Sequence, residues 1–250
     1  MMTRLTCGVA RKRIVARHVG CSAPAMNHTA TIHPSDSLAQ LATARAGASR
    51  VFHRHNLDFC CHGQISLADA CRKKGLDVDT LIHQIEAEQR IAEPVEPWTE
   101  RPIAELVEHI VAHFHEPHRR ELPRLQSMAE RVEKVHGDKA SCPRGLAALI
   151  AGLAADLVLH MQKEERILFP MIVRGEGADA AGPIQVMEQE HVDASAVLAA
   201  IRDLTTDYQP PPEACGTWKA LYLGLDEFER DLMQHVHLEN HVLFPRALHS

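Results

Sequence analysis

The sequence predicts an all-α protein that combines a four-helix bundle with a small helical amino-terminal domain. Four long segments carry apolar residues at helical spacing, which is the main signal for amphipathic helices. The connections between them are rich in glycine or proline, which are typical of turns and loops. No segment shows the alternation of apolar and polar residues expected of a strand, and 250 residues suffice for one medium and one small domain.

The small domain is expected over residues 34–92. A serine or an aspartate at the start of each helical pattern can accept a hydrogen bond from a free backbone N–H. Three residues fit this role: Ser37, Ser66 and Asp77. The first helix is expected to reach about residue 52, and the second to stop at Gly75. Between them, HNLDFCCHG at residues 55–63 interrupts the helical pattern and contains two adjacent cysteines.

Residues 1–33 form a basic leader that differs from the rest of the chain. They carry several arginines and a lysine, and no acidic residue occurs before Asp36. They lack the continuous apolar stretch of a secretory signal. Three interpretations stay open: a disordered tail, a start placed too far upstream with Met26 as the true start, or a transit-like leader.

The bundle is expected over residues 103–250, after a linker at 93–102 that contains three prolines in EPVEPWTERP. Its helical patterns cover residues 103–135, 143–173, 183–204 and 213–248. Pro117 and Pro123 fall inside the first pattern and should bend or interrupt that helix. Four helices with short or moderate connections predict a bundle whose functional groups lie in its core.

Composition excludes several classes of protein. A net charge of -6 argues against nucleic acid as the main partner, because phosphate binding needs a clustered basic face. No apolar run reaches the ~18 residues that span a membrane, so no membrane partner is expected. The seven cysteines form no C-x-x-C pair, which argues against a zinc ribbon or a thioredoxin site. Without a secretion signal, reduced thiols in the cytoplasm are the default.

Histidine is the unusual feature, with 18 residues in the chain. Histidine is the commonest metal ligand in proteins. Two passages share one frame: HMQKEERILFP at residues 160–170 and HVHLENHVLFP at residues 235–245. In each passage a glutamate follows the first histidine by four residues, and Leu-Phe-Pro closes the segment. The repeated frame indicates a shared role for the histidine and the glutamate.

The repeat extends upstream into the preceding helices. One histidine, His115, precedes the first frame by 45 residues, and another, His191, precedes the second by 44 residues. The chain therefore contains a duplicated two-helix unit with pseudo-two-fold symmetry. The candidate metal ligands are His115, His160, Glu164, His191, His235 and Glu239.

Helix geometry explains why these residues suit a two-metal site. Residues four apart share a helix face with their Cβ atoms about 5–6 Å apart, so a histidine and a glutamate can reach one metal. Metal ions in paired sites lie about 3.5–4 Å apart, a distance that a carboxylate can bridge. The mixed nitrogen and oxygen set favours iron, with manganese next, and differs from structural zinc sites. Metal binding would also offset the cost of burying these polar groups.

Other polar residues near the repeat leave alternatives open. His113 and His118 compete with His115 as the ligand from the first helix, because Pro117 obscures the helical phase there. His118, Arg119 and His136 are candidates for groups that orient the ligands. Asp156 and Glu190 are candidates for groups that gate protons or steer a cation toward the site. For all five residues, a solvated surface position is the competing interpretation.

Six motifs together carry a resemblance to a known family. They are DFCCHG at residues 58–63, HEPHRRELP at 115–123, HMQKEERILFPMI at 160–172, MEQEH at 187–191, PPPEAC at 210–215 and HVHLENHVLFPRAL at 235–248. With these motifs, residues 37–248 resemble the di-iron proteins that repair iron–sulfur clusters, the repair of iron centres family, within the hemerythrin-like superfamily. His62 departs from this pattern because a glycine is expected after the cysteine pair, and the leader lies outside the resemblance.

The resemblance implies a cytoplasmic, stress-induced protein that restores iron–sulfur clusters damaged by nitric oxide or oxidants. It implies the same six ligands for two iron ions, with Glu164 and Glu239 as bridges beside an oxo or hydroxo group. Cys60 and Cys61 match the cysteine pair of the family's small domain. The expected partners are damaged iron–sulfur proteins and nitric oxide or oxygen as a small ligand, and a homodimer is a further expectation.

Three functions compete for this site, and the sequence leaves open whether the protein is an enzyme. The first is cluster repair by iron release or by nitric oxide removal. The second is a protein that binds or reduces nitric oxide. The third is an oxygen carrier, which is less expected because carriers use five histidines while this repeat supplies two for each metal. Cys60 and Cys61 are candidates for thiol exchange, metal hand-off or docking, against simple packing.

Overall fold

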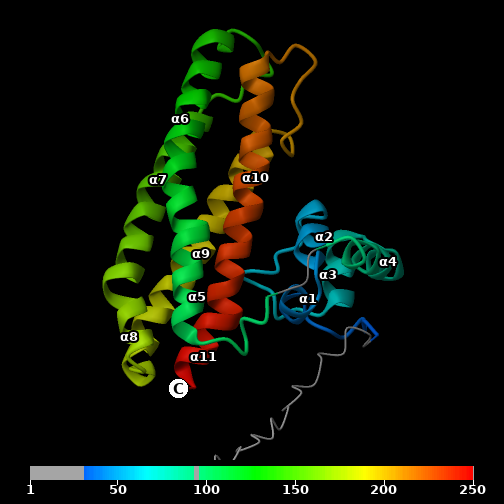
Figure 1. The fold of residues 1–250 in the computed structure, drawn as a ribbon. Helices are drawn as coiled ribbons and strands as arrows, with labels where there is room; N and C mark the ends of the chain where they lie inside the picture. The colour runs from blue at the N-terminus through cyan, green and yellow to red at the C-terminus, as the bar shows by residue number, and fades with distance from the viewer. Residues whose placement is uncertain (1–30, 93–95, 250) are drawn as a thin grey trace, which may run out of the picture. The chain divides into compact units, whose positions relative to one another are not determined.

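The computed structural model describes residues 31–92 and 96–249. Residues 1–30 of the expected leader and residues 93–95 of the expected linker lie outside the described residues. Within the described ranges the chain forms helices and turns and no strand, apart from one isolated bridge between Ser37 and Ser66. The all-α prediction is therefore confirmed (Figure 1).

The amino-terminal part contains four short helices. They are α1 (Leu38–Ala44), α2 (Ala48–Arg54), α3 (Leu67–Lys74) and α4 (Val78–Gln89). The three expected caps are confirmed, because the side chains of Ser37, Ser66 and Asp77 each accept a bond from a first-turn backbone N–H. The prediction of a single helix that reaches about residue 52 is wrong, because the chain forms two helices there. Gly47, at φ 81°, separates α1 from α2 in a left-handed conformation that side chains disfavour.

The carboxyl-terminal part forms the four-helix bundle. Its elements are α5 (Ile103–Ile110), η1 (Val111–His115), α6 (Glu116–His136), α7 (Leu146–Lys163), η2 (Glu164–Leu168), α8 (Phe169–Val173), α9 (Gly177–Leu204), α10 (Gly216–Leu238), η3 (Glu239–Leu243) and α11 (Phe244–Leu248), where η marks a π-helix. Helix α6 packs against α7 and α10, and α7 packs against α9 (Figure 1). The interior between these helices is where the predicted ligands can meet.

Two details of the expected bundle can be compared with the structure. Pro123 lies inside α6 without ending it, whereas Pro117 follows a switch from π-helix to α-helix. The third long helix begins at Gly177 rather than near residue 183, so most of the glycine-rich stretch is helical. Only Gly175, at φ 74°, adopts the left-handed conformation that lets the chain turn between α8 and α9.

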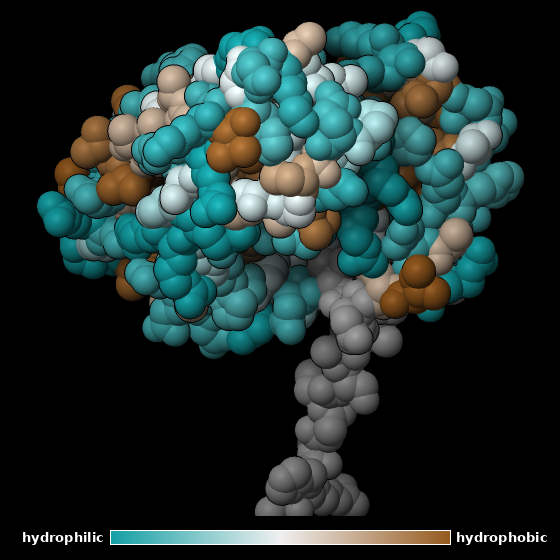
Figure 2. All heavy atoms as spheres, turned by 90° about the horizontal axis from the view of Figure 1, so that it is seen from above, coloured by the Kyte–Doolittle hydropathy of each residue, from teal (hydrophilic) through white to brown (hydrophobic). Residues whose placement is uncertain are grey.

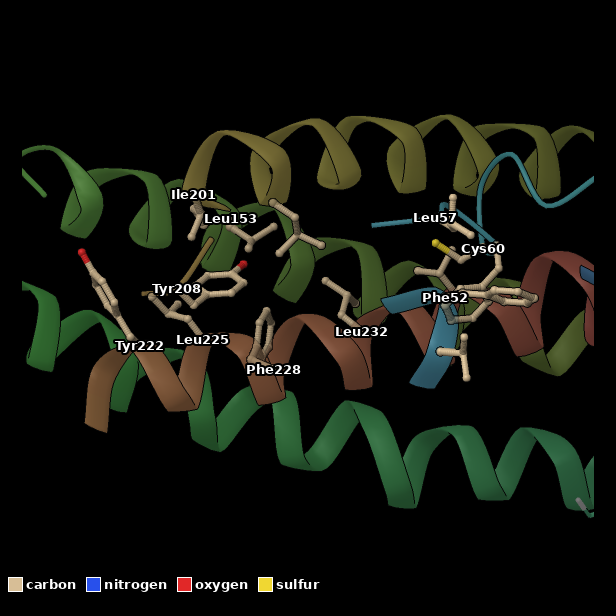
Figure 3. Packing of buried hydrophobic residues seen from close by; sticks show 14 of the residues in the cluster. Phe52, Leu57, Cys60, Leu153, Ile201, Tyr208, Tyr222, Leu225, Phe228 and Leu232 are labelled. Carbon is tan, nitrogen blue, oxygen red and sulfur yellow. The ribbon is translucent and has the colours of Figure 1, made fainter. Parts of the chain in front are cut away.

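One hydrophobic core joins the small helices to the bundle. Phe52 and Leu57 are 0% and 2% exposed and belong to the same cluster as Leu232 of α10. Figure 3 shows Phe52, Leu57 and Cys60 gathered beside the helix that carries Leu232. This packing holds the loop with the two cysteines against the bundle.

The face in Figure 2 is mostly hydrophilic, with isolated hydrophobic side chains among polar ones. The segment Leu146–Val173 is long and apolar enough to cross a membrane by length and composition alone. In the structure it packs against α6 and α9, and it carries His160 and Glu164 into the bundle interior. This packing fits a core helix of the bundle.

Candidate metal centre

The bundle brings all six sequence-predicted ligands together in its interior. Each is between 0% and 3% exposed, and they come from η1, α7, η2, α9, α10 and η3. They form two groups of four side chains whose ligand atoms lie within 4.8 Å of one another. The groups are His115, Glu164, His235 and Glu239, and His160, Glu164, His191 and Glu239.

The first group pairs the imidazoles of His115 and His235. Their Nε2 atoms are 3.1 Å apart. Nε2 of His115 lies 3.4 Å from Oε2 of Glu164, and Nε2 of His235 lies 3.0 Å from Oε1 of Glu239. Two nitrogen atoms and two carboxylates thus face one point.

The second group repeats this arrangement with His160 and His191. Their Nε2 atoms are also 3.1 Å apart. Nε2 of His160 lies 3.3 Å from Oε2 of Glu164, and Nε2 of His191 lies 3.2 Å from Oε2 of Glu239. The two glutamates belong to both groups, which is the position of a bridging carboxylate.

The site has the donor set of a paired metal centre. Both oxygens of Glu164 and Oε2 of Glu239 are buried without a hydrogen-bond partner among the described residues. A buried carboxylate without partners is costly, and native proteins rarely leave such groups unpaired. Cations held by these oxygens and by the facing Nε2 atoms would satisfy them. The residues therefore fit two metal ions with mixed nitrogen and oxygen ligands.

The same side chains shift one another's pKa values. Burial alone would lower the pKa of His160, but the nearby Glu164 and Glu239 outweigh it and raise this pKa to about 9. Burial would raise the pKa of Glu239, but His235 and the other histidines outweigh it and hold this pKa well below the usual value. Glu239 is therefore ionised and can act as a metal ligand.

Three of the four imidazoles are oriented by a bond at Nδ1. His115 bonds to Glu165 at 2.7 Å, His160 to Glu190 at 2.9 Å and His191 to Asn240 at 2.8 Å. In the neutral imidazole such a bond fixes the tautomer, so that the lone pair on Nε2 is the one available to a metal. The sequence offered Glu190 as a group that gates protons or steers a cation, or as a solvated carboxylate, and gave no role to Glu165 or Asn240. Their signal is the internal repeat, because each follows a predicted bridging glutamate.

His235 is the exception. Its Nδ1 has no hydrogen-bond partner within the described part of the chain. Its ring instead stacks on Phe114, with centroids 5.3 Å apart and an angle of 6° between the planes. Phe114 precedes His115, as Glu190 precedes His191. The duplicated halves therefore share ligands but differ in the residues that orient them.

Three of the candidate ligands lie in π-helical segments, which the sequence patterns do not predict. Segments η1, η2 and η3 include His115, Glu164 and Glu239, and each begins six residues before a proline. Proline has no N–H to donate to the carbonyl four residues earlier, so a regular α-helix loses a bond there. A π-helical turn moves the bonding pattern just before the proline, and such turns are common at functional sites. The prolines in the sequence are the signal that could have predicted these π-helical segments.

The two other candidates for the ligand from the first helix, His113 and His118, lie outside both ligand groups. His113 is exposed, with Nδ1 3.1 Å from the carbonyl of His109. His118 is 2% exposed and its ring centroid lies 5.4 Å from that of His235, yet it belongs to neither group. The structure therefore places His115 in a group of candidate ligands and His118 beside that group.

The other polar residues that the sequence singled out lie outside the two ligand groups. Arg119 donates to Glu165 at 2.7 Å and so supports the residue that orients His115. His136 instead lies 3.3 Å from the thiol of Cys215. Asp156 is exposed on α7.

The cysteine pair forms a third cluster with Asp58. The two sulfur atoms are 3.8 Å apart, and the Cys60 thiol donates to Asp58 at 3.3 Å. The Cys61 thiol and burial raise the pKa of Cys60 well above its ordinary value, so Cys60 stays protonated. Cys61 is the partly exposed thiol of the pair.

A cavity of about 260 Å³ is lined both by this cluster and by His191 of the candidate centre. Its walls include Asp58, Cys60 and Cys61 from the loop, and His191 and Ser195 from α9. A small molecule in this cavity could therefore contact both the accessible thiol and a ligand histidine.

Gly63 allows the loop to approach the bundle closely. A Cβ atom there would overlap the carbonyl oxygen of Phe59 and lie 2.9 Å from Nε2 of His241. We expect Gly63→Ala to lower the free energy of unfolding by about 1–3 kcal/mol, as overpacking does. Urea denaturation measures this change. Gly152→Ala is the control, because nothing lies within 4 Å and alanine should stabilise helix α7 by about 0.5–1 kcal/mol. Equal stability of Gly63→Ala and the natural chain would contradict the close approach.

The fold and the two groups define a helical bundle with a histidine–carboxylate site for paired cations. Residues 78–247 match the hemerythrin family, described as the hemerythrin HHE cation binding domain, and residues 34–89 match a domain of unknown function called ScdA_N. The chain is 49% identical over 214 residues to iron-sulfur cluster repair proteins YtfE of Yersinia pseudotuberculosis (serotypes O:1b, strain IP 31758, and O:3, strain YPIII) and of Yersinia pestis (strain Pestoides F). These matches cover 86% of this chain and 97% of each relative.

The chain belongs to the hemerythrin family and, within it, to the iron–sulfur cluster repair proteins. The resemblance inferred from the six motifs is thereby confirmed. The hemerythrin match covers every predicted ligand.

Proposed function

We propose that this protein binds two iron ions at the six-residue centre and restores iron–sulfur clusters damaged by nitric oxide or oxidants. One observation carries the proposal: two groups of four ligands share both glutamates. The relatives that align with nearly the whole chain are named for cluster repair, which supports the same role here. Damaged iron–sulfur proteins are then the partners.

The chain's own residues would prepare the site. Glu164 and Glu239 would help to hold both ions, because each belongs to both groups of candidate ligands. The Nδ1 bonds to Glu165, Glu190 and Asn240 hold three imidazoles with Nε2 facing inward. Bound iron would supply one-electron chemistry and metal for rebuilding a cluster.

The ligand number favours a labile centre. Each group offers four side chains, two of which it shares with the other group. Four side chains would hold each ion, and protonation of the histidines among them would aid the release of iron. Iron donation therefore suits this geometry better than permanent storage.

The cavity supports a second candidate function, the binding or reduction of nitric oxide. It reaches His191 from the side of Cys61, so a small ligand could approach the centre there. An oxygen carrier is less supported, because carriers use five histidines and the two ligand groups contain four. His118, whose ring lies close to that of His235, belongs to neither group.

We place this activity in the cytoplasm, where thiols stay reduced. The described cysteines are free, including the adjacent Cys60 and Cys61. Reduced thiols beside the centre agree with that compartment.

The test begins with protein purified without oxygen and loaded with isotopically labelled Fe(II). We expect about two irons per chain, in line with a paired site. Incubation with an iron–sulfur enzyme inactivated by nitric oxide should restore that enzyme's activity and transfer labelled iron to it. The control is the same incubation with an equal amount of free Fe(II).

Two results would change the conclusion. Recovery no greater than with free Fe(II) would contradict repair. Consumption of nitric oxide with nitrous oxide as product, and without recovery of the damaged enzyme, would favour the second function.

A further inference from the structure

Asn240 connects the cysteine loop to a ligand of the centre. It is the first residue after Glu239 in η3. Its Oδ1 lies 2.8 Å from Nδ1 of His191, and its Nδ2 donates to the backbone carbonyl of Cys60 at 3.0 Å. One side chain thus bonds both to a metal ligand and to a loop 180 residues away in the sequence.

The carbonyl of Cys60 determines how the amide of Asn240 is oriented. A carbonyl can only accept a hydrogen bond, so the NH₂ group of Asn240 must face it. Oδ1 then faces His191 and can only accept, so Nδ1 of His191 carries the proton. In the neutral imidazole the lone pair is then on Nε2, which faces Oε2 of Glu239 at 3.2 Å. The tautomer that binds metal depends on the position of one loop carbonyl.

The loop is built to hold that carbonyl in place. Oδ1 of Asp58 accepts from the backbone N–H of Cys60 at 3.2 Å and of Cys61 at 2.9 Å. Gly63 lets the same loop lie against the bundle without a Cβ overlap. A displacement of the loop would therefore move the carbonyl away from Asn240.

The equivalent position in the other half lacks this link. Glu165 follows Glu164, and its Oε1 accepts from His115 and from Arg119, both at 2.7 Å. Both partners belong to the bundle. Of these two residues, only Asn240 bonds to the cysteine loop. Within the described residues, this link therefore serves the His160–His191 pair and not the His115–His235 pair.

We propose that Asn240 is a positioning residue that couples the Cys60–Cys61 loop to the His160–His191 half of the centre. The inference rests on the proposed metal site and assigns its two halves different roles. Metal at His191 favours the Asn240 bond and therefore a loop held against the bundle. By reciprocity, a loop held against the bundle favours metal at His191. A partner or a reaction that moves the loop at Cys61 would weaken this half first.

The experiment measures Cys61 alkylation by iodoacetamide, with and without Fe(II), in the absence of oxygen. Fragmentation of the labelled peptide separates Cys61 from Cys60, and a metal competition titration gives iron affinity. In the natural chain, iron should slow Cys61 alkylation by about 5-fold or more, the usual lower range for coupled sites.

Two substitutions at one position separate orientation from coupling. Asn240→Leu removes both bonds, so it should weaken one iron site about 10–100-fold and make Cys61 alkylation independent of iron. Asn240→Asp keeps an acceptor for Nδ1 of His191 but repels the Cys60 carbonyl. It should retain most iron affinity while losing the iron effect on Cys61, a separation that mere loss of folding stability would not produce.

Glu165→Leu is the matched control in the other half. It should weaken iron binding through His115 and leave the iron effect on Cys61 intact. Persistence of that effect in Asn240→Asp would overturn the coupling. Two bound irons without any effect on Cys61 in the natural chain would also overturn it and leave the proposed function standing. Failure to bind iron would instead refute the proposed function itself.

Discussion

Glu239→Leu is expected to abolish the paired metal centre, with iron content falling from about two ions per chain to below about one. Glu239 lies 3.0 Å from His235 in one ligand group and 3.2 Å from His191 in the other. Its loss removes an anionic ligand from both ions at once. The loss of affinity should exceed about 100-fold, the upper range for removing a residue that only orients a ligand.

Metal analysis after anaerobic loading measures this result, and circular dichroism checks that the helices form. Glu227→Leu is the control, because it removes an exposed glutamate from α10, the helix that leads directly into η3, and should still bind two irons. His160→Gln gives a further comparison, since His160 belongs to one group only and its loss should leave about one iron. Full iron content in Glu239→Leu would show that this residue does not bridge the ions.

Arg202→Met is expected to lower the free energy of unfolding by about 3–5 kcal/mol, the usual cost of breaking a buried ion pair. Arg202 pairs with Glu229 and Asp207, lies 3.2 Å from Nε2 of His53 and covers the ring of Tyr208 at 4.9 Å. The side chains of Arg202 and Glu229 are 14% and 8% exposed. Without the arginine, a buried carboxylate loses its main partner.

Urea denaturation at equal metal content measures the loss. Arg230→Met is the control, because its pair with Asp231 is exposed and should contribute about 0–1 kcal/mol. Adding Glu229→Leu to Arg202→Met should recover part of the stability, since the unpaired charge is then removed. A loss as small as that of the control would show that Arg202 does not stabilise the fold.

The effect of Arg202 should also depend on pH. Burial would raise the pKa of Glu229, but bonds with His53 and Arg202 outweigh it and hold this pKa below the usual value. A lowered pKa in the folded state stabilises the fold at pH values above the pKa in the unfolded chain, about 4.3. This contribution fades as the pH falls through the folded pKa. The difference between natural chain and variant should therefore be largest near neutral pH and shrink in acid.

The arrangement around Arg202 also explains a feature of the loop after α9. Thr206, Asp207 and Tyr208 have φ values of 53°, 57° and 55°, which is unusual for residues with side chains. The bond to Asp207 and the packing over Tyr208 hold this turn from α9. Nothing in the proline-rich sequence that follows predicts such a turn.

The sequence by itself determined the bundle, the helix caps and the six residues that meet in the centre. These features depend on local geometry: residues four apart share a helix face, and a serine or aspartate caps the helix that follows it. The duplicated frame, together with the histidine upstream of each copy, extended the prediction of ligands from one helix to four. His115 was the least certain ligand because Pro117 obscured the phase, and the structure places it 3.1 Å from His235.

The tertiary structure alone decided what surrounds those six residues. The partners of the imidazoles come from other helices, such as Glu165 at 50 residues from His115 and Asn240 at 49 from His191. Such contacts depend on how helices pack, and helical periodicity carries no information about them. The bond from Asn240 to the Cys60 carbonyl depends further on how the small helices dock, so only the folded chain connects the cysteine loop with the centre.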